Sequence, residues 1–284
     1  MVITASLVNE LRQKTGAGMM DCKKALTEAD GDIQKAIEIL RKKGASVAAK
    51  RAERSANEGL MLTHVSDDKK TGVIVEVNCE TDFVANSDDF KSFANLVLET
   101  VAKNKPADVN ALLGDSAVNE KLNEVMGKVG EKIQVSRFAI DTAENGVVVG
   151  YVHLGSKLGV LVTIDNVTKA ADEMAELGKD IAMQIAAMKP LCTYREEVPK
   201  DLIDKEIEIY KELARKEGKP ENILEKIATG KLNKYYQENC LVEQAFIKDN
   251  AKSVGDLIKE FNSKHGTQAK IIHFRRFHLS DESK

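Results

Sequence analysis

The sequence predicts an α+β fold with an N-terminal three-helix module, a duplicated core of two α+β subdomains, and a projecting antiparallel helical hairpin. Apolar residues recur at helical spacing through the first 55 residues, which predicts helices there. In the middle of the chain, a pair of β-branched segments bounded by glycine occurs twice, which indicates a repeated unit. Near residue 200, two charged helical segments carry narrow apolar stripes and predict a helical hairpin.

The first predicted unit, residues 1–55, contains three amphipathic helices and a basic helical linker. Glycine-containing turns at residues 15–18 and 30–32 separate the helices. A core built from so few residues is marginal by itself, so we expect this module to dock onto another protein.

The core prediction rests on the spacing of four glycines. Gly72 follows Gly59 by thirteen residues, and Gly159 follows Gly146 by the same thirteen. Each strand pair precedes an amphipathic helix, so we expect one subdomain over residues 56–140 and a second over 141–198 plus 237–284. Residues 107–135 read as helical, and residues 269–279 read as a last strand.

The third predicted unit, residues 199–236, is a helical hairpin. Gly218-Lys219-Pro220 supplies the turn between its two helices. Because the apolar stripes are narrow and the remaining positions charged, we expect an antiparallel coiled coil that projects from the core.

Composition excludes several classes of protein. The net charge of −3 disfavours a dedicated nucleic-acid binder, and no apolar stretch is long enough for a membrane span. The first residues do not resemble a secretory signal. The four cysteines are widely separated in sequence, without a C-x-x-C pair, which disfavours structural zinc or a disulfide scaffold and favours a reducing cytoplasm.

No motif predicts an active site. Gly16-Ala17-Gly18 lacks the context of a dinucleotide fingerprint, and the chain has no phosphate-binding P-loop sequence. His273 and His278 lie five residues apart on a predicted strand, so they face opposite sides and do not favour a metal pair. We therefore expect no catalytic residue, no metal and no cofactor.

Basic residues offer one alternative, an RNA-associated binding protein. The linker carries Arg41, Lys42, Lys43, Lys50, Arg51 and Arg54. Arg275 and Arg276 add charge to the last strand, where we expect a solvated edge. A solvated helix is the simpler interpretation of the linker.

Two places are unusual on physical grounds. Met19 and Met20 are adjacent at a helix start, so they cannot both face one core, and an exposed Met suits a protein contact. Phe83 follows the first repeat's central strand, where an aromatic residue is either core or a protruding wedge. These patterns indicate a docking protein of several parts.

These two places also carry a family resemblance. Residues 11–26 (LRQKTGAGMMDCKKAL) closely resemble the N-terminal signature of the bacterial elongation factor Ts family, and residues 76–86 (EVNCETDFVAN) resemble its second signature. Both motifs are long and specific. The order of modules, the repeated core and the hairpin also match, so the resemblance covers nearly the whole chain.

The resemblance implies guanine-nucleotide exchange on elongation factor Tu, with no chemical step. It implies a UBA-like N-terminal module that docks on the partner's GTPase domain; its contact residues would be Arg12, Met19, Met20 and Lys23. It implies that the core inserts a segment between partner helices, displacing Mg²⁺ and disturbing the phosphate loop. That segment comprises Thr81, Asp82, Phe83 and Val84.

The resemblance also implies a second core contact on the GTPase domain through His153, and a homodimer. The hairpin would serve self-association or further partner contact. Well-known members carry a C-terminal helix beyond the last strand, and here only residues 280–284 follow Leu279. We expect that contact to be absent or replaced.

Overall fold

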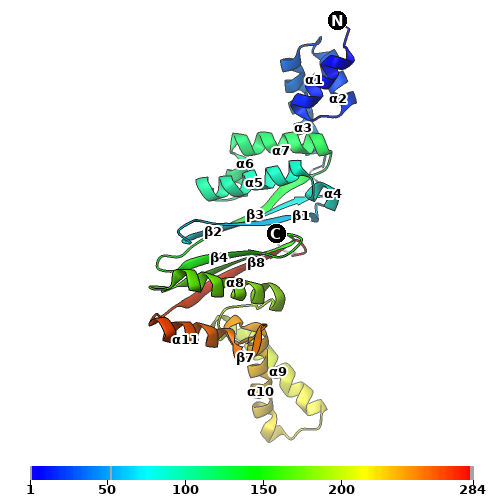
Figure 1. Cartoon of the computed structure of the whole chain (residues 1–284). Coiled ribbons are helices and arrows are strands. Elements are labelled where there is room, and N and C mark those ends of the chain that lie inside the picture. Colours follow the sequence, from blue (N-terminus) through cyan, green and yellow to red (C-terminus); the bar gives the residue numbers. More distant parts are fainter. Residues whose placement is uncertain (1, 52, 282–284) are drawn as a thin grey trace.

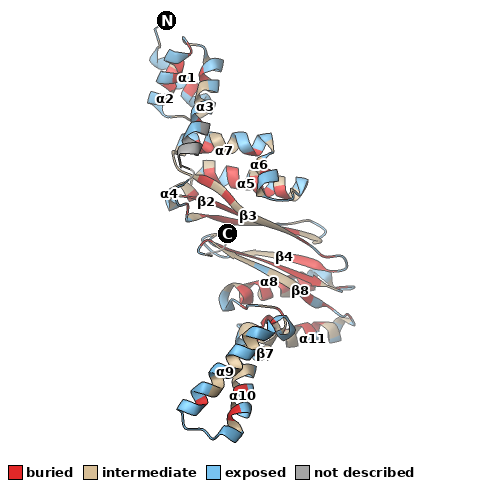
Figure 2. Ribbon diagram, turned by 180° about the vertical axis from the view of Figure 1, so that it is seen from behind, coloured by how far each residue is buried: buried red, intermediate tan, exposed pale blue. Residues whose placement is uncertain are grey.

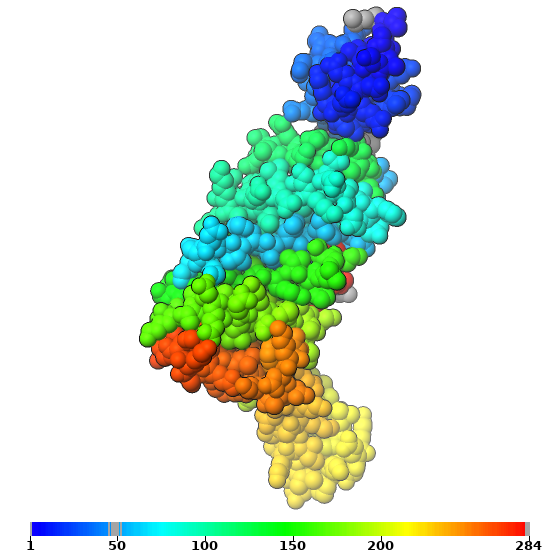
Figure 3. All heavy atoms as spheres, in the orientation of Figure 1, coloured from blue at the N-terminus to red at the C-terminus, as the bar shows by residue number. Residues whose placement is uncertain are grey.

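A computed structural model describes residues 2–51 and 53–281; the side chains of residues 45 and 47–50 are not described. The molecule is elongated, with the N-terminal helices at one end, two stacked sheets in the middle and a helical hairpin at the other end (Figure 1). The space-filling view shows the hairpin as a separate projection (Figure 3). The fold is therefore α+β, as predicted.

The N-terminal helices are α1 (Ala5–Thr15), α2 (Met19–Glu28) and α3 (Ile33–Arg51). Thr4 caps α1, because its hydroxyl accepts a hydrogen bond from the Leu7 N–H at 3.3 Å. Gly16 ends the helix with φ 65°, a left-handed conformation that favours glycine. The three helices share a small apolar cluster whose buried members include Val8, Leu11, Cys22, Ala25, Leu26 and Ala36.

The first sheet has the strand order β1 (Glu58–Val65), β2 (Thr71–Cys79), β3 (Ile133–Thr142), all antiparallel. Helices α4 (Asp82–Ala85), α5 (Asp88–Asn104), α6 (Val109–Leu113) and α7 (Ser116–Val129) lie between β2 and β3 in sequence. The inner faces of α5 and α7 pack with this sheet in one core cluster.

The second sheet has the strand order β4 (Val147–Val152), β5 (Leu158–Asp165), β8 (Lys270–His278), again antiparallel. Helices α8 (Ala171–Met188) and α11 (Val254–His265) contribute to its core cluster. Short elements lie between them: η1 (Arg195–Glu197), η2 (Leu241–Glu243), β6 (Ala245–Phe246) and β7 (Asp249–Ser253).

The two sheets pack face to face, so both faces of each central strand are buried (Figure 2). Side chains alternate along a strand. In β2, Val75 and Val77 therefore point to the helices, while Ile74 points to the other sheet. The sheets approach closely at glycines: a Cβ on Gly72 would lie 2.4 Å from Val148 Cγ1. This double burial explains the near-continuous apolar runs of β2 and β5.

Ion pairs also cross between the sheets. Arg275 on β8 donates through Nε to the buried Asp141 carboxylate on β3 at 2.7 Å. Arg276 is largely buried, with its side chain 15% exposed. The expectation of a solvated edge is therefore wrong for Arg276, whereas Arg275 keeps 42% of its side chain exposed while its Nε bonds to Asp141.

The hairpin consists of α9 (Lys200–Lys216) and α10 (Glu221–Asn239), which pack against each other around small and apolar residues such as Ala214, Leu224 and Ala228. Gly218, with φ 75°, lies in the turn between them. At the base of the hairpin, side chains of α9 and α10 pack in an apolar cluster with the buried residues Val198, Tyr236 and Cys240.

The prediction of helix throughout residues 107–135 is wrong at its end. Strand β3 begins at Ile133 and pairs with β2 along its whole length. Its sequence, IQVSRFAIDT, places Arg137 and Asp141 at buried or half-buried positions. These charged residues interrupt the apolar pattern by which a strand is recognised.

Candidate docking site

The segment after β2 forms a single helical turn that presents an aromatic side chain to solvent. Thr81 precedes α4 with extended backbone, and its hydroxyl accepts a long hydrogen bond from the Val84 N–H at 3.4 Å. Ala85 is buried and anchors the turn, whereas Phe83 is 84% exposed. The turn thus exposes its largest apolar side chain while a small one holds it against the core.

Glu131 fixes the start of this turn. Its two carboxylate oxygens accept hydrogen bonds from the Thr81 N–H at 3.0 Å and the Thr81 hydroxyl at 2.7 Å. Bonds to a charged acceptor are stronger than neutral ones, so this pair holds the backbone at the first residue of the Phe83 turn. Sequence reasoning missed Glu131, because nothing local in sequence links it to a residue fifty positions earlier.

Glu80 makes a parallel connection to the linker. Its carboxylate accepts from the Lys132 N–H at 2.7 Å and from the guanidinium groups of Arg54 at 3.1 Å and Arg51 at 3.5 Å. Burial opposes the charged form, but the Lys132 N–H and the two arginines outweigh it and hold the pKa of Glu80 below its usual value. The end of the N-terminal unit is thus tied to the residue before Thr81.

The β4–β5 turn lies at the same end of the stacked sheets. Ser156 in this turn accepts from the Met61 N–H at 2.7 Å, and Lys157 pairs with Glu58 at 2.7 Å. His153 is exposed, and its Nδ1 lies 2.8 Å from the Tyr151 hydroxyl. Next to it, Leu154 is 94% exposed. Sequence reasoning missed Leu154; an apolar residue at a turn before Gly155 was the available signal.

The N-terminal module offers a second exposed apolar surface. Met19 and Met20 begin α2 and are 53% and 63% exposed, so neither enters the core. Arg12 and Lys23 are also exposed. In both opposed views, α2 and α4 lie on the same side of the long axis (Figures 1 and 2). The predicted residues of both segments are therefore exposed, in separate patches.

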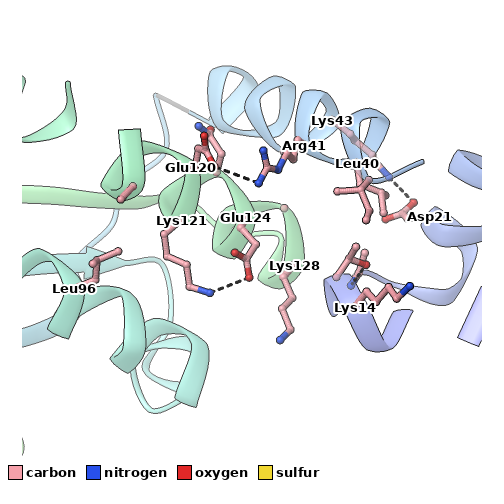
Figure 4. A pocket seen from close by; sticks show the side chains of 17 residues that line it. Lys14, Asp21, Leu40, Arg41, Lys43, Leu96, Glu120, Lys121, Glu124 and Lys128 are labelled. Atoms are coloured by element: carbon pink, nitrogen blue, oxygen red, sulfur yellow. Dashed lines mark hydrogen bonds and ion pairs between the residues drawn. The ribbon is translucent and has the colours of Figure 1, made fainter. Parts of the chain in front are cut away.

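A cleft of about 350 Å³ separates the N-terminal helices from the core (Figure 4). Ion pairs line it: Arg41 with Glu120 at 3.2 Å, Lys43 with Asp21, and Lys121 with Glu124 at 2.9 Å. Beside the cleft, α3 and α7 cross at Gly44, where a Cβ would lie 2.6 Å from the Asn123 carbonyl oxygen. The crossing requires glycine at position 44 and determines where the N-terminal helices lie relative to α7.

The same contacts bear on the RNA-associated alternative. Arg41, Lys43, Arg51 and Arg54 are each paired with a carboxylate. Lys42 is exposed, and the Lys50 side chain lies outside the described residues. Within the described part of the chain, most of the basic run is thus engaged in intramolecular ion pairs. Fewer charges are then available to neutralise phosphate.

Over residues 2–51 and 53–281, no group of three or more His, Cys, Asp or Glu is arranged to hold a metal ion. Over the same ranges, no helix has the length and apolar character needed to cross a bilayer.

Comparison with known proteins gives one consistent result. A family model described as elongation factor TS matches residues 80–281. Elongation factor Ts of Chloroherpeton thalassium is 48% identical, with 99% of each chain covered. Elongation factor Ts of Chlorobium phaeobacteroides is 47% identical over 98% of each chain, and that of Clostridium botulinum is 46% identical over 97% of this chain and 92% of its own.

Proposed function

The chain belongs to the elongation factor Ts family of translation elongation factors, and from that premise we propose how it promotes GDP release from elongation factor Tu. The observation that carries the proposal is the 84% exposure of Phe83. The turn that presents it is held to the core by the buried Ala85 and at its start by the Glu131 carboxylate, which we call the carboxylate clamp. The segment formed by Thr81, Asp82, Phe83 and Val84 enters the partner's GTPase domain beside the nucleotide. There it displaces Mg²⁺ and disturbs the phosphate loop.

Free-energy magnitudes show why one wedge is not enough. Accelerating release by ~10⁴ requires roughly 5.5 kcal/mol of barrier lowering. Burying a Phe side chain contributes only about 1.5–3 kcal/mol. The remainder must come from loss of the Mg²⁺ charge at the phosphates and from docking contacts elsewhere. The separate exposed patches on α2 and the β4–β5 turn supply such contacts.

We assign the docking contacts to two surfaces. Arg12, Met19, Met20 and Lys23 of the N-terminal module bind the GTPase domain, in the manner of a UBA-like three-helix unit. His153 makes a second core contact on that domain. The adjacent Leu154, 94% exposed, extends this contact and buries apolar area on binding.

Each of the four units has its own proposed role. Residues 1–55 dock on the partner, and residues 56–140 carry the Phe83 wedge. Residues 141–198 plus 237–284 carry His153, and residues 199–236 form the projecting coiled coil. The coiled coil mediates homodimerisation or contacts a further region of the partner. The protein acts in the cytoplasm and accelerates exchange by binding alone, without making or breaking a covalent bond.

A nucleotide-release assay tests the proposal. Elongation factor Tu from the same source is loaded with fluorescent GDP, and release into excess unlabelled GDP is followed with wild type, Phe83→Ala and Phe90→Leu. Phe90 is fully buried and serves as the matched aromatic control, because its change affects the core rather than the wedge.

We expect strong acceleration by wild type and a loss of about tenfold or more for Phe83→Ala, corresponding to burial of one aromatic side chain. A folded Phe90→Leu protein should retain exchange. Acceleration unaffected by Phe83→Ala would remove the wedge role. No acceleration by folded wild type would overturn the exchange function itself.

A further inference from the structure

Cys192 and Cys240 meet at the base of the hairpin, outside both docking surfaces. Their Sγ atoms lie 3.5 Å apart. Both are free thiols in the structure. The two backbones run side by side here as an isolated parallel bridge, with the Leu191 N–H bonded to the Asn239 carbonyl at 2.8 Å and the Leu241 N–H bonded to the Cys192 carbonyl at 2.9 Å.

From this geometry we propose that Cys192 and Cys240 form a dithiol site that small disulfides, of the glutathione disulfide class, oxidise to an intramolecular disulfide. Residues on adjacent paired strands have Cα atoms about 5 Å apart, within the range that a disulfide spans. The sulfurs need only approach each other by a rotation about each Cα–Cβ bond and a small backbone adjustment.

The two cysteines have different access to solvent, which assigns their roles. Cys192 is half-buried, so an external disulfide reaches it first; Cys240 is fully buried and acts second. Burial raises the pKa of both thiols, that of Cys240 to about 12. Since the thiolate is the attacking species, oxidation is slow at neutral pH and accelerates with rising pH.

The chemistry proceeds in two exchange steps. The Cys192 thiolate attacks one sulfur of glutathione disulfide, the S–S bond of glutathione breaks, and one glutathione leaves as thiolate and takes up a proton. Cys240 then loses its proton to water and attacks the Cys192 sulfur, expelling the second glutathione. Two cysteine thiols are oxidised to one disulfide, and one glutathione disulfide is reduced to two glutathiones.

The bridge would close the chain around the whole hairpin. Cys192 precedes α9, and Cys240 is the C-cap residue of α10. A disulfide between them fixes both ends of the projection and removes conformational freedom from its unfolded state. The oxidised hairpin should therefore unfold at a higher temperature than the reduced one.

The test incubates the full-length protein with glutathione disulfide, blocks the remaining thiols and maps the peptides by mass spectrometry. We expect a linked Cys192–Cys240 peptide pair, loss of two hydrogen atoms from the intact mass, and reversal by a dithiol reductant. Cys22 and Cys79 should stay free, because each is buried and neither has another thiol beside it among the described residues. The rate should rise about tenfold per pH unit below the thiol pKa.

Two variants sharpen the assignment. Cys240→Ser should trap glutathione on Cys192 as a stable mixed disulfide, and Cys192→Ser should leave Cys240 unmodified. If Cys240→Ser fails to fold, peptide mapping of the oxidised wild-type protein still shows whether Cys192 and Cys240 become linked. Glutathione retained on wild-type Cys192, a disulfide between two chains, or no modification at elevated pH would each overturn the proposal.

Discussion

At the scale of single residues, the exposure of Phe83 depends on a carboxylate that does not contact it. Glu131 accepts two hydrogen bonds from Thr81, and each bond to a charged group contributes about 1.5–3 kcal/mol. The pair orients the turn before any partner arrives. A preoriented wedge loses less conformational entropy on binding than a mobile one, which is why position matters as much as apolar area.

Removing that carboxylate should therefore weaken exchange without unfolding the core. We expect Glu131→Ala to lower the maximal rate of GDP release about tenfold, equivalent to about 1.4 kcal/mol. Glu131→Gln retains one acceptor oxygen and should lose less. The measurement is the release assay beside thermal unfolding, with Glu260→Ala on α11 as a charge-matched control that should retain full exchange. An equal loss of the maximal release rate in Glu131→Ala and Glu260→Ala would contradict the proposed role of Glu131 in holding the Phe83 turn.

At the scale of elements, helix α11 carries a pH-dependent cap. The Asp256 carboxylate accepts from the Ser253 N–H at 3.1 Å and hydroxyl at 2.8 Å, completing a capping box. These bonds lower the pKa of Asp256 from 3.8 to about 2. A lowered folded-state pKa means that the stabilisation is complete above pH 4 and disappears as the pH falls toward 2.

The expected result is local unfolding of the first turn of α11 at acid pH. Hydrogen exchange at the Asp256 amide, corrected for intrinsic rates, should become faster between pH 4 and 2 in wild type. Asp256→Asn should show weaker protection at every pH and little change over this interval. Protection in wild type that stays constant down to pH 2 would show that the carboxylate does not support the cap.

Helix crossing governs the placement of the whole N-terminal module. Because a Cβ on Gly44 would lie 2.6 Å from the Asn123 carbonyl oxygen, Gly44→Ala must push α3 away from α7. We expect this substitution to reduce GDP release severalfold while the module and core remain folded. Gly230 on α10 has no atom within 4 Å of such a Cβ. Gly230→Ala should therefore stabilise its helix by up to about 1 kcal/mol and leave exchange unchanged.

Circular dichroism and the release assay on both variants check this prediction. A Gly44→Ala protein with unchanged exchange would mean that the position of the module does not limit docking. A Gly230→Ala protein with reduced exchange would instead implicate the hairpin in the partner contact.

The sequence predicted local structure well where the apolar pattern along an element is uninterrupted. Helices α5 and α8 and the strand pairs followed from periodicity and bounding glycines. Strand β3 did not, because Arg137 and Asp141 occupy positions that face the other sheet and are neutralised there by Glu76 and Arg275. Charges that are paired across a distant contact look like solvent-facing residues in a sequence.

The same limit applies to the candidate site. Phe83, Met19 and Met20 could be singled out from sequence, because each is a large apolar residue where the local pattern has no room for it. Glu131 could not, since its role depends on a contact between segments fifty residues apart in the chain. Leu154 was missed, although an apolar residue in a turn before Gly155 was a usable signal. A carboxylate clamp is recognisable only once Thr81 and Glu131 are placed side by side.

At the scale of the whole molecule, exchange is a coupling between two ligands of one partner. If this protein weakens GDP binding to elongation factor Tu, GDP must weaken binding of this protein by the same factor. A contact that persists throughout release lowers the free energy of the encounter and of the transition state alike, so it affects affinity but not maximal rate. A contact made only as the nucleotide leaves affects the rate.

Substitutions in the α2 surface and at Phe83 should therefore change different kinetic parameters. Met20→Ala should raise the concentration for half-maximal release about fivefold, from loss of roughly 1 kcal/mol of apolar contact, and leave the maximal rate unchanged. Phe83→Ala should lower the maximal rate. The measurement is stopped-flow GDP release over a wide range of exchange-factor concentration. Met188→Ala is the control, because Met188 is 48% exposed at the end of α8, away from both patches. If Met20→Ala and Phe83→Ala altered the same parameter, the separation of docking from displacement would be wrong.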